Sequence, residues 1–167
     1  MRIAVGADHA GFRYKETLAR DLREAGHEVL DLGTDDEASV DYPDYARAVA
    51  EAVREGRVDR GLVVCGSAVG VTMAANKVPG VRAGTCHDCY SARQAVEHDD
   101  MNVLCLGERV IGIELARAVL RAFLDAAFTG AERHRRRLDK VRAIERDYGG
   151  GGPGATVVDG PDAEPEP

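Results

Sequence analysis

The sequence has little of what several protein classes need. Its 167 residues include no tryptophan and only 5% aromatic residues, so platforms for stacking unpaired bases are scarce. The formal net charge is -7 at pH 7, the wrong sign for a general nucleic-acid binder. No apolar run approaches the ~20 residues that a membrane-spanning helix needs. We therefore expect neither nucleic acid nor a membrane among the partners of this protein.

Cysteine is also scarce, and no secretory signal is visible. The chain enters a strand-like run at Arg2 without a signal peptide, and it has four cysteines. This pattern suggests reduced thiols, so we expect a cytoplasmic protein. The hydrophobic content of 44% is typical of a globular domain. We expect a single domain over residues 1–148, followed by a disordered tail, residues 149–167, in which glycine, proline and acidic residues dominate.

Strand-like and helix-like segments alternate along this domain. The predicted strands cover residues 2–6, 27–32, 62–65, 81–85 and 103–106. The predicted helices cover residues 12–25, 42–55, 71–77, 90–97, 113–128 and 132–148. This alternation predicts an α/β fold with a doubly wound, five-stranded parallel sheet and an extra helix at the C-terminal end.

The stretch from Gly61 to Lys77, GLVVCGSAVGVTMAANK, is the centre of the functional argument. Cys65 ends a buried strand, and the loop after it, Gly66 to Gly70, leads into a helix. Ligands of open α/β sheets bind at such strand ends, and a helix N-terminus favours an anion or a thiolate there. The loop fits neither the Walker nor the dinucleotide-binding pattern. An ordinary tight turn with a buried, inert cysteine fits this stretch equally well.

Other polar residues follow the remaining strands of the predicted sheet. Asp8 and His9 come directly after the first strand, and the carboxyl ends of parallel strands share one edge. We therefore expect these two residues beside Cys65 and Ser67, a combination of acid–base, nucleophilic and hydroxyl groups. As alternatives, Asp8 fits a helix N-cap and His9 a solvated loop.

Three clusters lie further along the chain. A predicted loop from His98 to Asn102 places a histidine among acids, where it could transfer protons or simply face solvent. Arg133 and Arg137 are four residues apart and share a helix face, which suits a phosphate or a solvated basic surface. Cys86 and Cys89 form a C-x-x-C pair, but no second pair completes a zinc site.

Taken together, these motifs resemble the ribose-5-phosphate isomerase B family, which includes the galactose-6-phosphate isomerase subunits. The resemblance covers about residues 1–147. It implies a Rossmann-like fold, a homodimer often paired into a tetramer, and active sites shared between two subunits. It also implies a cofactor-free, metal-free aldose–ketose isomerase acting on a phosphorylated sugar. The matching stretches are GADHAGF, DYPDYA, VVCGSAVGVTMAANK, EHDDMNVLCLGERV, GIELA and RHRRR.

The resemblance also implies roles for individual residues. Cys65 matches the base that moves a proton between C2 and C1, and Ser67 assists transfer of the hydroxyl proton. His98 matches the histidine that opens the sugar ring, with Asp8 on the opposite side of the sugar. The loop that holds the enediolate oxygens comprises Gly66, Ala68, Val69 and Gly70. The positions implied to bind the substrate or its phosphate are His9, Tyr42, Asp99, Arg109, Arg133 and Arg137.

Two residues depart from the family pattern and leave the substrate open. Ala68 stands where glycine is expected, and Asp99 where asparagine is usual. We expect ribose 5-phosphate as the substrate, with allose 6-phosphate, galactose 6-phosphate or a tetrulose phosphate as alternatives. A non-catalytic sugar-phosphate-binding subunit is a further alternative, and a zinc or redox protein built on Cys86 and Cys89 is the least favoured.

Overall fold

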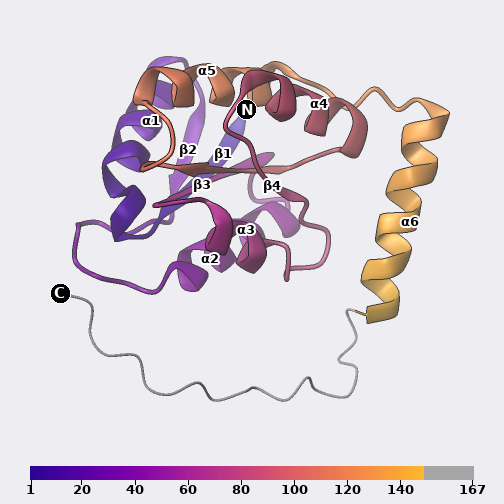
Figure 1. Cartoon of the computed structure of the whole chain (residues 1–167), viewed down its shortest axis with the longest axis horizontal. Coiled ribbons are helices and arrows are strands. Elements are labelled where there is room, and N and C mark those ends of the chain that lie inside the picture. The colour runs from indigo at the N-terminus through magenta and orange to yellow at the C-terminus, as the bar shows by residue number, and fades with distance from the viewer. Residues whose placement is uncertain (149–167) are drawn as a thin grey trace.

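The computed structural model describes residues 1–148, so the tail predicted to be disordered lies outside the described residues. Its strands are β1 Arg2–Ala7, β2 Glu28–Asp31, β3 Arg60–Cys65, β4 Ala83–Thr85 and β5 Val103–Gly107. They form one parallel sheet in the order β2-β1-β3-β5-β4 (Figure 1). This confirms the prediction of a Rossmann-like, doubly wound α/β fold.

Helices cover both faces of the sheet. A short 3-10 helix, η1, spans His9–Gly11, and the α-helices are α1 Phe12–Glu24, α2 Tyr42–Arg54, α3 Val69–Ala75, α4 Cys89–Asp99, α5 Ile113–Asp125 and α6 Glu132–Tyr148. In Figure 1, α1, α4 and α5 lie over one face, and α2 and α3 lie over the other. Within residues 1–148, no helix combines the length and apolar character that crossing a membrane requires.

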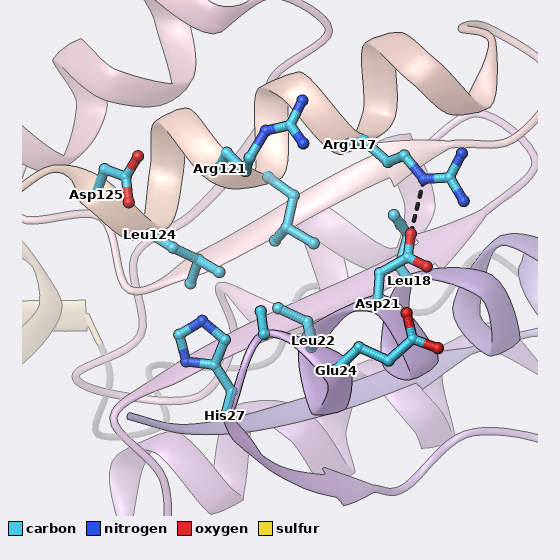
Figure 2. Close-up of a pocket in the computed structure, with 11 residues that line it drawn as sticks. Leu18, Asp21, Leu22, Glu24, His27, Arg117, Arg121, Leu124 and Asp125 are labelled. Carbon is cyan, nitrogen blue, oxygen red and sulfur yellow. Dashed lines mark hydrogen bonds and ion pairs between the residues drawn. The ribbon is translucent and has the colours of Figure 1, made fainter.

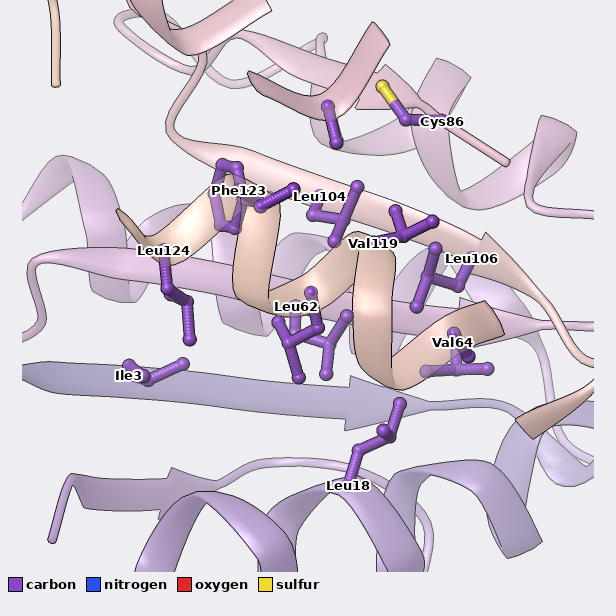
Figure 3. Packing of buried hydrophobic residues seen from close by; sticks show 14 of the residues in the cluster. Ile3, Leu18, Leu62, Val64, Cys86, Leu104, Leu106, Val119, Phe123 and Leu124 are labelled. Atoms are coloured by element: carbon purple, nitrogen blue, oxygen red, sulfur yellow. The ribbon is translucent and has the colours of Figure 1, made fainter. Parts of the chain in front are cut away.

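The central strand β3 supplies side chains to two separate hydrophobic cores. Successive side chains of a strand point to opposite faces of the sheet. Leu62 and Val64 therefore pack under α1, α4 and α5, beside Phe123 (Figure 3). Val63 and Cys65 pack against α2 and α3 on the other face. Burial on both faces explains why this strand reads as a continuous apolar run.

Helix α6 lies at the β4 side of the molecule, outside the two layers of helices that cover the sheet (Figure 1). It contacts α4, and its His134 and Leu138 are buried, whereas its later turns run beside the β4 edge, where Glu145 accepts a hydrogen bond from the Gly80 N–H at 2.8 Å. Its later apolar side chains are exposed, with Val141 at 53% and Ile144 at 60% relative exposure. A single chain therefore leaves an apolar face of α6 open to solvent.

Several predicted element ends were wrong: the helix predicted over residues 71–77 is α3, Val69–Ala75, and the strand predicted over residues 81–85 is β4, Ala83–Thr85. The predicted loop histidine His98 lies in the last turn of α4, which continues to Asp99 before Asp100 ends it in the left-handed conformation. The helix predicted to reach Phe128 ends at Asp125. Arg60 of β3 donates hydrogen bonds to the Phe123 and Ala126 carbonyls at this end, so a contact distant in sequence terminates the helix.

Candidate active site

A pocket of about 380 Å³ lies at the carboxyl edge of the sheet. The ends of β1, β3 and β5 and the start of α2 converge there, as expected for a ligand site in this kind of sheet. The structure thus brings together many of the predicted site residues. The pocket is lined by Asp8, His9, Ala10, Tyr42, Cys65, Gly66, Ser67, Gly70, Arg109 and Val110.

Cys65, the last residue of β3, lines this pocket. Its side chain is 5% exposed, and the backbone N–H of Ala68 donates a hydrogen bond to its sulfur at 3.0 Å. Ala68 is fully buried and adopts a left-handed conformation, with φ 72°. Ala68, which stands where glycine is expected, therefore still adopts a backbone conformation that glycine adopts readily. Val69 begins α3 and is exposed rather than lining the pocket.

Two glycines allow the walls of the pocket to approach closely. A Cβ at Gly70 would lie 2.8 Å from the ring of Tyr42, which packs directly on this residue. A Cβ at Gly11 would lie 2.4 Å from the Val64 carbonyl group. The loops after β1 and β3 and the start of α2 can therefore pack together only because these positions lack a side chain.

Asp8 is both a helix cap and a wall of the pocket. Its carboxylate accepts a hydrogen bond from the backbone N–H of Ala10 at 2.9 Å, so the alternative N-cap role is correct for η1. Burial raises the pKa of Asp8, although the Ala10 hydrogen bond and the charges of His9 and Arg109 oppose this effect. The arrangement places one partly desolvated carboxyl beside an imidazole and a guanidinium.

His9 and Arg109 supply hydrogen-bond donors to the same pocket. The backbone N–H of Val40 donates to Nδ1 of His9 at 3.2 Å, which leaves Nε2 as the donor of the ring. The side chain of Arg109 lies over Gly66, and its backbone N–H donates to the Gly66 carbonyl at 3.1 Å. An anionic group entering the pocket would therefore meet an imidazole N–H and a guanidinium.

His98 and Arg133 gather elsewhere, where α4 meets α6. The rings of His98 and His134 lie with centroids 4.1 Å apart, and Arg133 Nε donates to His134 Nε2 at 2.9 Å. Gln94 Nε2 lies 3.0 Å from His98 Nδ1, one helical turn away on α4. Within the described part of the chain, none of these side chains lines the Cys65 pocket.

Asp99 and Arg137 line a third place, a groove of about 270 Å³ between α6, α4 and β4. One chain therefore divides the predicted site residues between the Cys65 pocket, the His98 cluster and this groove. Neither Gln94 nor His134 is among the site residues predicted from the sequence. The four-residue spacing of Gln94 and His98 could have suggested their contact, but the histidine was predicted in a loop.

The remaining cysteines form no site with the features of the Cys65 pocket. Burial raises the pKa of Cys86 to about 11, while Cys89 of the C-x-x-C pair is exposed. Among the described residues, no group of three or more histidine, cysteine, aspartate or glutamate side chains converges to hold a metal ion. The zinc alternative therefore gains no support from the arrangement of these side chains.

A further hollow, of about 340 Å³, lies between α1 and α5 (Figure 2). It has a leucine floor and a charged rim, and Arg117 on that rim is already paired with Asp21 at 2.7 Å. His27, which precedes β2, also lines it, so the hollow lies toward the amino ends of the strands. Ligands of parallel sheets bind at the opposite edge, so we place the candidate active site at Cys65.

The fold and pocket define an α/β protein with a thiol, a carboxyl group and cationic groups at the carboxyl edge of its sheet. Residues 3–141 match the family model described as Ribose/Galactose Isomerase, and the chain belongs to that family. The resemblance seen in the sequence motifs is thereby confirmed.

Named relatives agree with this assignment. The chain is 46% identical to ribose-5-phosphate isomerase B of Escherichia coli over 145 residues, which covers 87% of this chain and 97% of the relative. It is 43% identical over 151 residues to D-erythrulose-4-phosphate isomerase 2 of Mycolicibacterium smegmatis, with 87% and 97% covered. A solved structure of Clostridium thermocellum ribose-5-phosphate isomerase B has a TM-score of 0.87 and 48% identity, covering 89% of this chain and 99% of that one.

Proposed function

We propose that this protein is a sugar-phosphate isomerase that interconverts ribose 5-phosphate and ribulose 5-phosphate through an enediolate, without a cofactor. The observation that carries the proposal is the Cys65 sulfur in a pocket lined by polar groups, 3.0 Å from the Ala68 backbone nitrogen that donates to it. Asp8 and Arg109 line the same pocket. Membership of the Ribose/Galactose Isomerase family supports it.

In the proposed mechanism, Cys65 acts as the base for proton transfer between two carbons. Its thiolate takes the proton from C2 of the open-chain aldose, and the negative charge moves to the carbonyl oxygen on C1. Ser67 helps move the C2 hydroxyl proton to that oxygen. The Cys65 thiol then returns its proton to C1, leaving a carbonyl at C2. Backbone N–H groups of the loop from Gly66 to Gly70 stabilise the enediolate oxygens.

Phosphate binding supplies the energy that positions the sugar. Arg109 and the Nε2 side of His9 are the proposed donors from the Cys65 pocket. Arg133 and Arg137 are further proposed donors, and a second copy of the chain would bring them to the pocket. His98 of that copy would open the sugar ring as a general acid–base group, with Asp8 on the opposite side of the sugar.

A homodimer accounts for the separation of these groups. His98 and Arg133 lie outside the Cys65 pocket of their own chain, and α6 exposes apolar Val141 and Ile144. Packing α6 and the end of α4 against a second copy would bury this face and complete both pockets. Two such dimers could pair into a tetramer. We place the enzyme in the cytoplasm, where its free cysteines stay reduced.

A different sugar phosphate is the main alternative substrate. Its support is the 43% identity to a relative named for D-erythrulose 4-phosphate, together with Ala68 and Asp99. Asp99 shares its groove with Arg137, so its negative charge would lie beside a proposed phosphate donor. A carboxylate there would weaken or redirect phosphate binding relative to an asparagine.

A panel of sugar phosphates tests the proposal. We would measure kcat/KM of the purified protein for ribose 5-phosphate, allose 6-phosphate, galactose 6-phosphate and erythrulose 4-phosphate. Ribose 5-phosphate should give the highest value, and Cys65→Ala should remove turnover of every substrate. A higher value for another sugar would change the substrate but keep the chemistry. Binding without turnover of any of the four would favour the non-catalytic subunit.

A further inference from the structure

Ala68 holds an unusual conformation at the most sensitive point of the proposed site. Its φ of 72° lies in the left-handed region, which L-residues other than glycine disfavour because Cβ approaches the backbone. Its side chain is fully buried, and its N–H donates to the sulfur of Cys65. Something in the surrounding structure must therefore hold this peptide against its own preference.

Three potential donors from two elements lie near the carbonyl oxygen of Ala68. The backbone N–H of Thr72 lies 3.1 Å from it, and the Thr72 hydroxyl lies 2.7 Å from it. The Thr85 hydroxyl, at the end of β4, lies 3.4 Å from the same oxygen and 2.6 Å from the Thr72 hydroxyl. Each hydroxyl has one proton, so Thr72 donates to Ala68 and Thr85 donates mainly to Thr72.

Thr85 distinguishes this arrangement from an ordinary helical contact. A threonine often bonds the carbonyl four residues earlier in its own helix, and Thr72 does so here. Thr85 comes from a different element, thirteen residues away in sequence, and ties that pair to the edge strand of the sheet. A residue of β4 thus contributes a hydrogen bond that supports the loop between β3 and α3.

We propose that Thr72 and Thr85 are positioning residues that hold Ala68 left-handed, so that its N–H faces the Cys65 sulfur. This inference rests on the proposed function of Cys65 as the base. The two hydroxyls fix the carbonyl side of the residue while its N–H meets the sulfur. An alanine can therefore occupy a position whose conformation glycine would adopt without such support.

The test is a double-mutant cycle with a matched control. Thr85→Val removes the hydroxyl but keeps the shape of the side chain, and Thr85→Ser keeps the hydroxyl. Ala68→Gly introduces a residue that adopts the left-handed conformation without support from the Thr85 hydroxyl. With Ala68 in place, Thr85→Val should lower kcat about tenfold, with KM changing less than about twofold, whereas Thr85→Ser should stay within about twofold of the parent. In the Ala68→Gly background, Thr85→Val should cost less than about twofold relative to that background.

Equal losses from Thr85→Val in both backgrounds, or from Thr85→Ser and Thr85→Val, would overturn the inference. A crystal structure of Thr85→Val gives a readout that does not depend on activity. We expect Ala68 to leave the left-handed region and its N–H to move beyond hydrogen-bond distance of the Cys65 sulfur. An unchanged loop would refute the inference even if the isomerase assignment holds, and a parent protein inactive on every sugar phosphate would refute the assignment alone.

Discussion

At the scale of single residues, Cys65 gives the most direct prediction. A base that acts in the transition state contributes to kcat more than to substrate binding. Cys65→Ala should therefore lower kcat on the best substrate at least ~100-fold while KM changes little. Steady-state kinetics would measure this, with Cys89→Ala as the matched control, because Cys89 is exposed and outside the pocket. Substantial activity in Cys65→Ala, with an intact fold by circular dichroism, would assign the base elsewhere.

Two buried cysteines predict how stability changes at alkaline pH. Burial raises the pKa of Cys86 to about 11 and that of Cys105 to about 12. An unfolded cysteine loses its proton near pH ~8.5, so above this pH the unfolded state binds fewer protons than the folded state. Linkage then requires the free energy of unfolding to fall as pH rises from ~8.5 toward these folded values.

Urea unfolding at pH 8, 9 and 10 would measure this decline. Cys105→Ala should make it shallower, because the folded and unfolded chains then differ by one fewer titrating thiol. Cys89→Ala should keep the slope of the parent, since Cys89 is exposed in the folded state. An equal slope in all three proteins would contradict the prediction.

The sequence predicted much of the Cys65 pocket because the rule behind it concerns topology. Parallel strands place their carboxyl ends together, so Asp8, His9 and Cys65 had to share an edge once the strands were identified. The conformation of Ala68 could not be predicted in this way. A left-handed alanine depends on hydroxyl groups from α3 and β4, and no local pattern marks that contact.

At the scale of elements, the buried Lys15 connects α1 to β2. Its side chain is 1% exposed, and its Nζ lies 2.9 Å from Asp31 and 2.8 Å from Glu16. Burial lowers the pKa of Lys15, but the hydrogen bonds and charges of Glu16 and Asp31 raise it by more. The amine therefore stays charged in the folded protein and depends on these carboxylates.

Removing Asp31 should be costly for this reason. Asp31→Ala leaves a buried ammonium with one carboxylate, and we expect a loss of about 2 kcal/mol, below the ~3–5 kcal/mol of a fully broken buried pair. Urea unfolding at pH 7 would measure the loss. Glu51→Ala, which removes an exposed ion pair with Arg47, should have little effect. Equal effects of the two variants would show that the Lys15 pair is not an important link.

Element ends were predicted less well than the elements themselves. The sequence after Glu97 is polar and predicts a loop, but α4 continues through His98 and Asp99. Asp100 then ends the helix, and its carboxylate pairs with Arg82 at 2.7 Å. This contact joins residues eighteen positions apart, so helix propensity alone could not show where the helix stops.

At the scale of the whole molecule, the described chain separates the groups that the proposed chemistry needs. The pocket holds Cys65, whereas His98 lies at the junction of α4 and α6. The sequence predicted the bounds of α6 correctly, but it could not show which helix α6 packs against or which of its faces stays exposed. Those features depend on contacts between α4 and α6 and, in our proposal, on a second subunit.

Mixed dimers test the shared site directly. Cys65→Ala and His98→Gln should each lower activity by at least ~100-fold when expressed alone. In a dimer with one copy of each variant, one pocket receives both substitutions and the other pocket receives neither. Random pairing makes about half of the dimers mixed, so co-expression should restore about one quarter of the parental activity.

Two affinity tags, one on each variant, would isolate the mixed dimers, which should have about half of the parental activity per dimer. Cys65→Ala co-expressed with the double variant Cys65→Ala/His98→Gln is the matched control, because no combination of these chains has an intact pocket. Restored activity in the first pair and none in the second would place Cys65 and His98 of different subunits in one active site. No restoration in doubly tagged, folded dimers would mean that each chain forms its active site alone, and the end of α4 would then have to move toward the Cys65 pocket of its own chain.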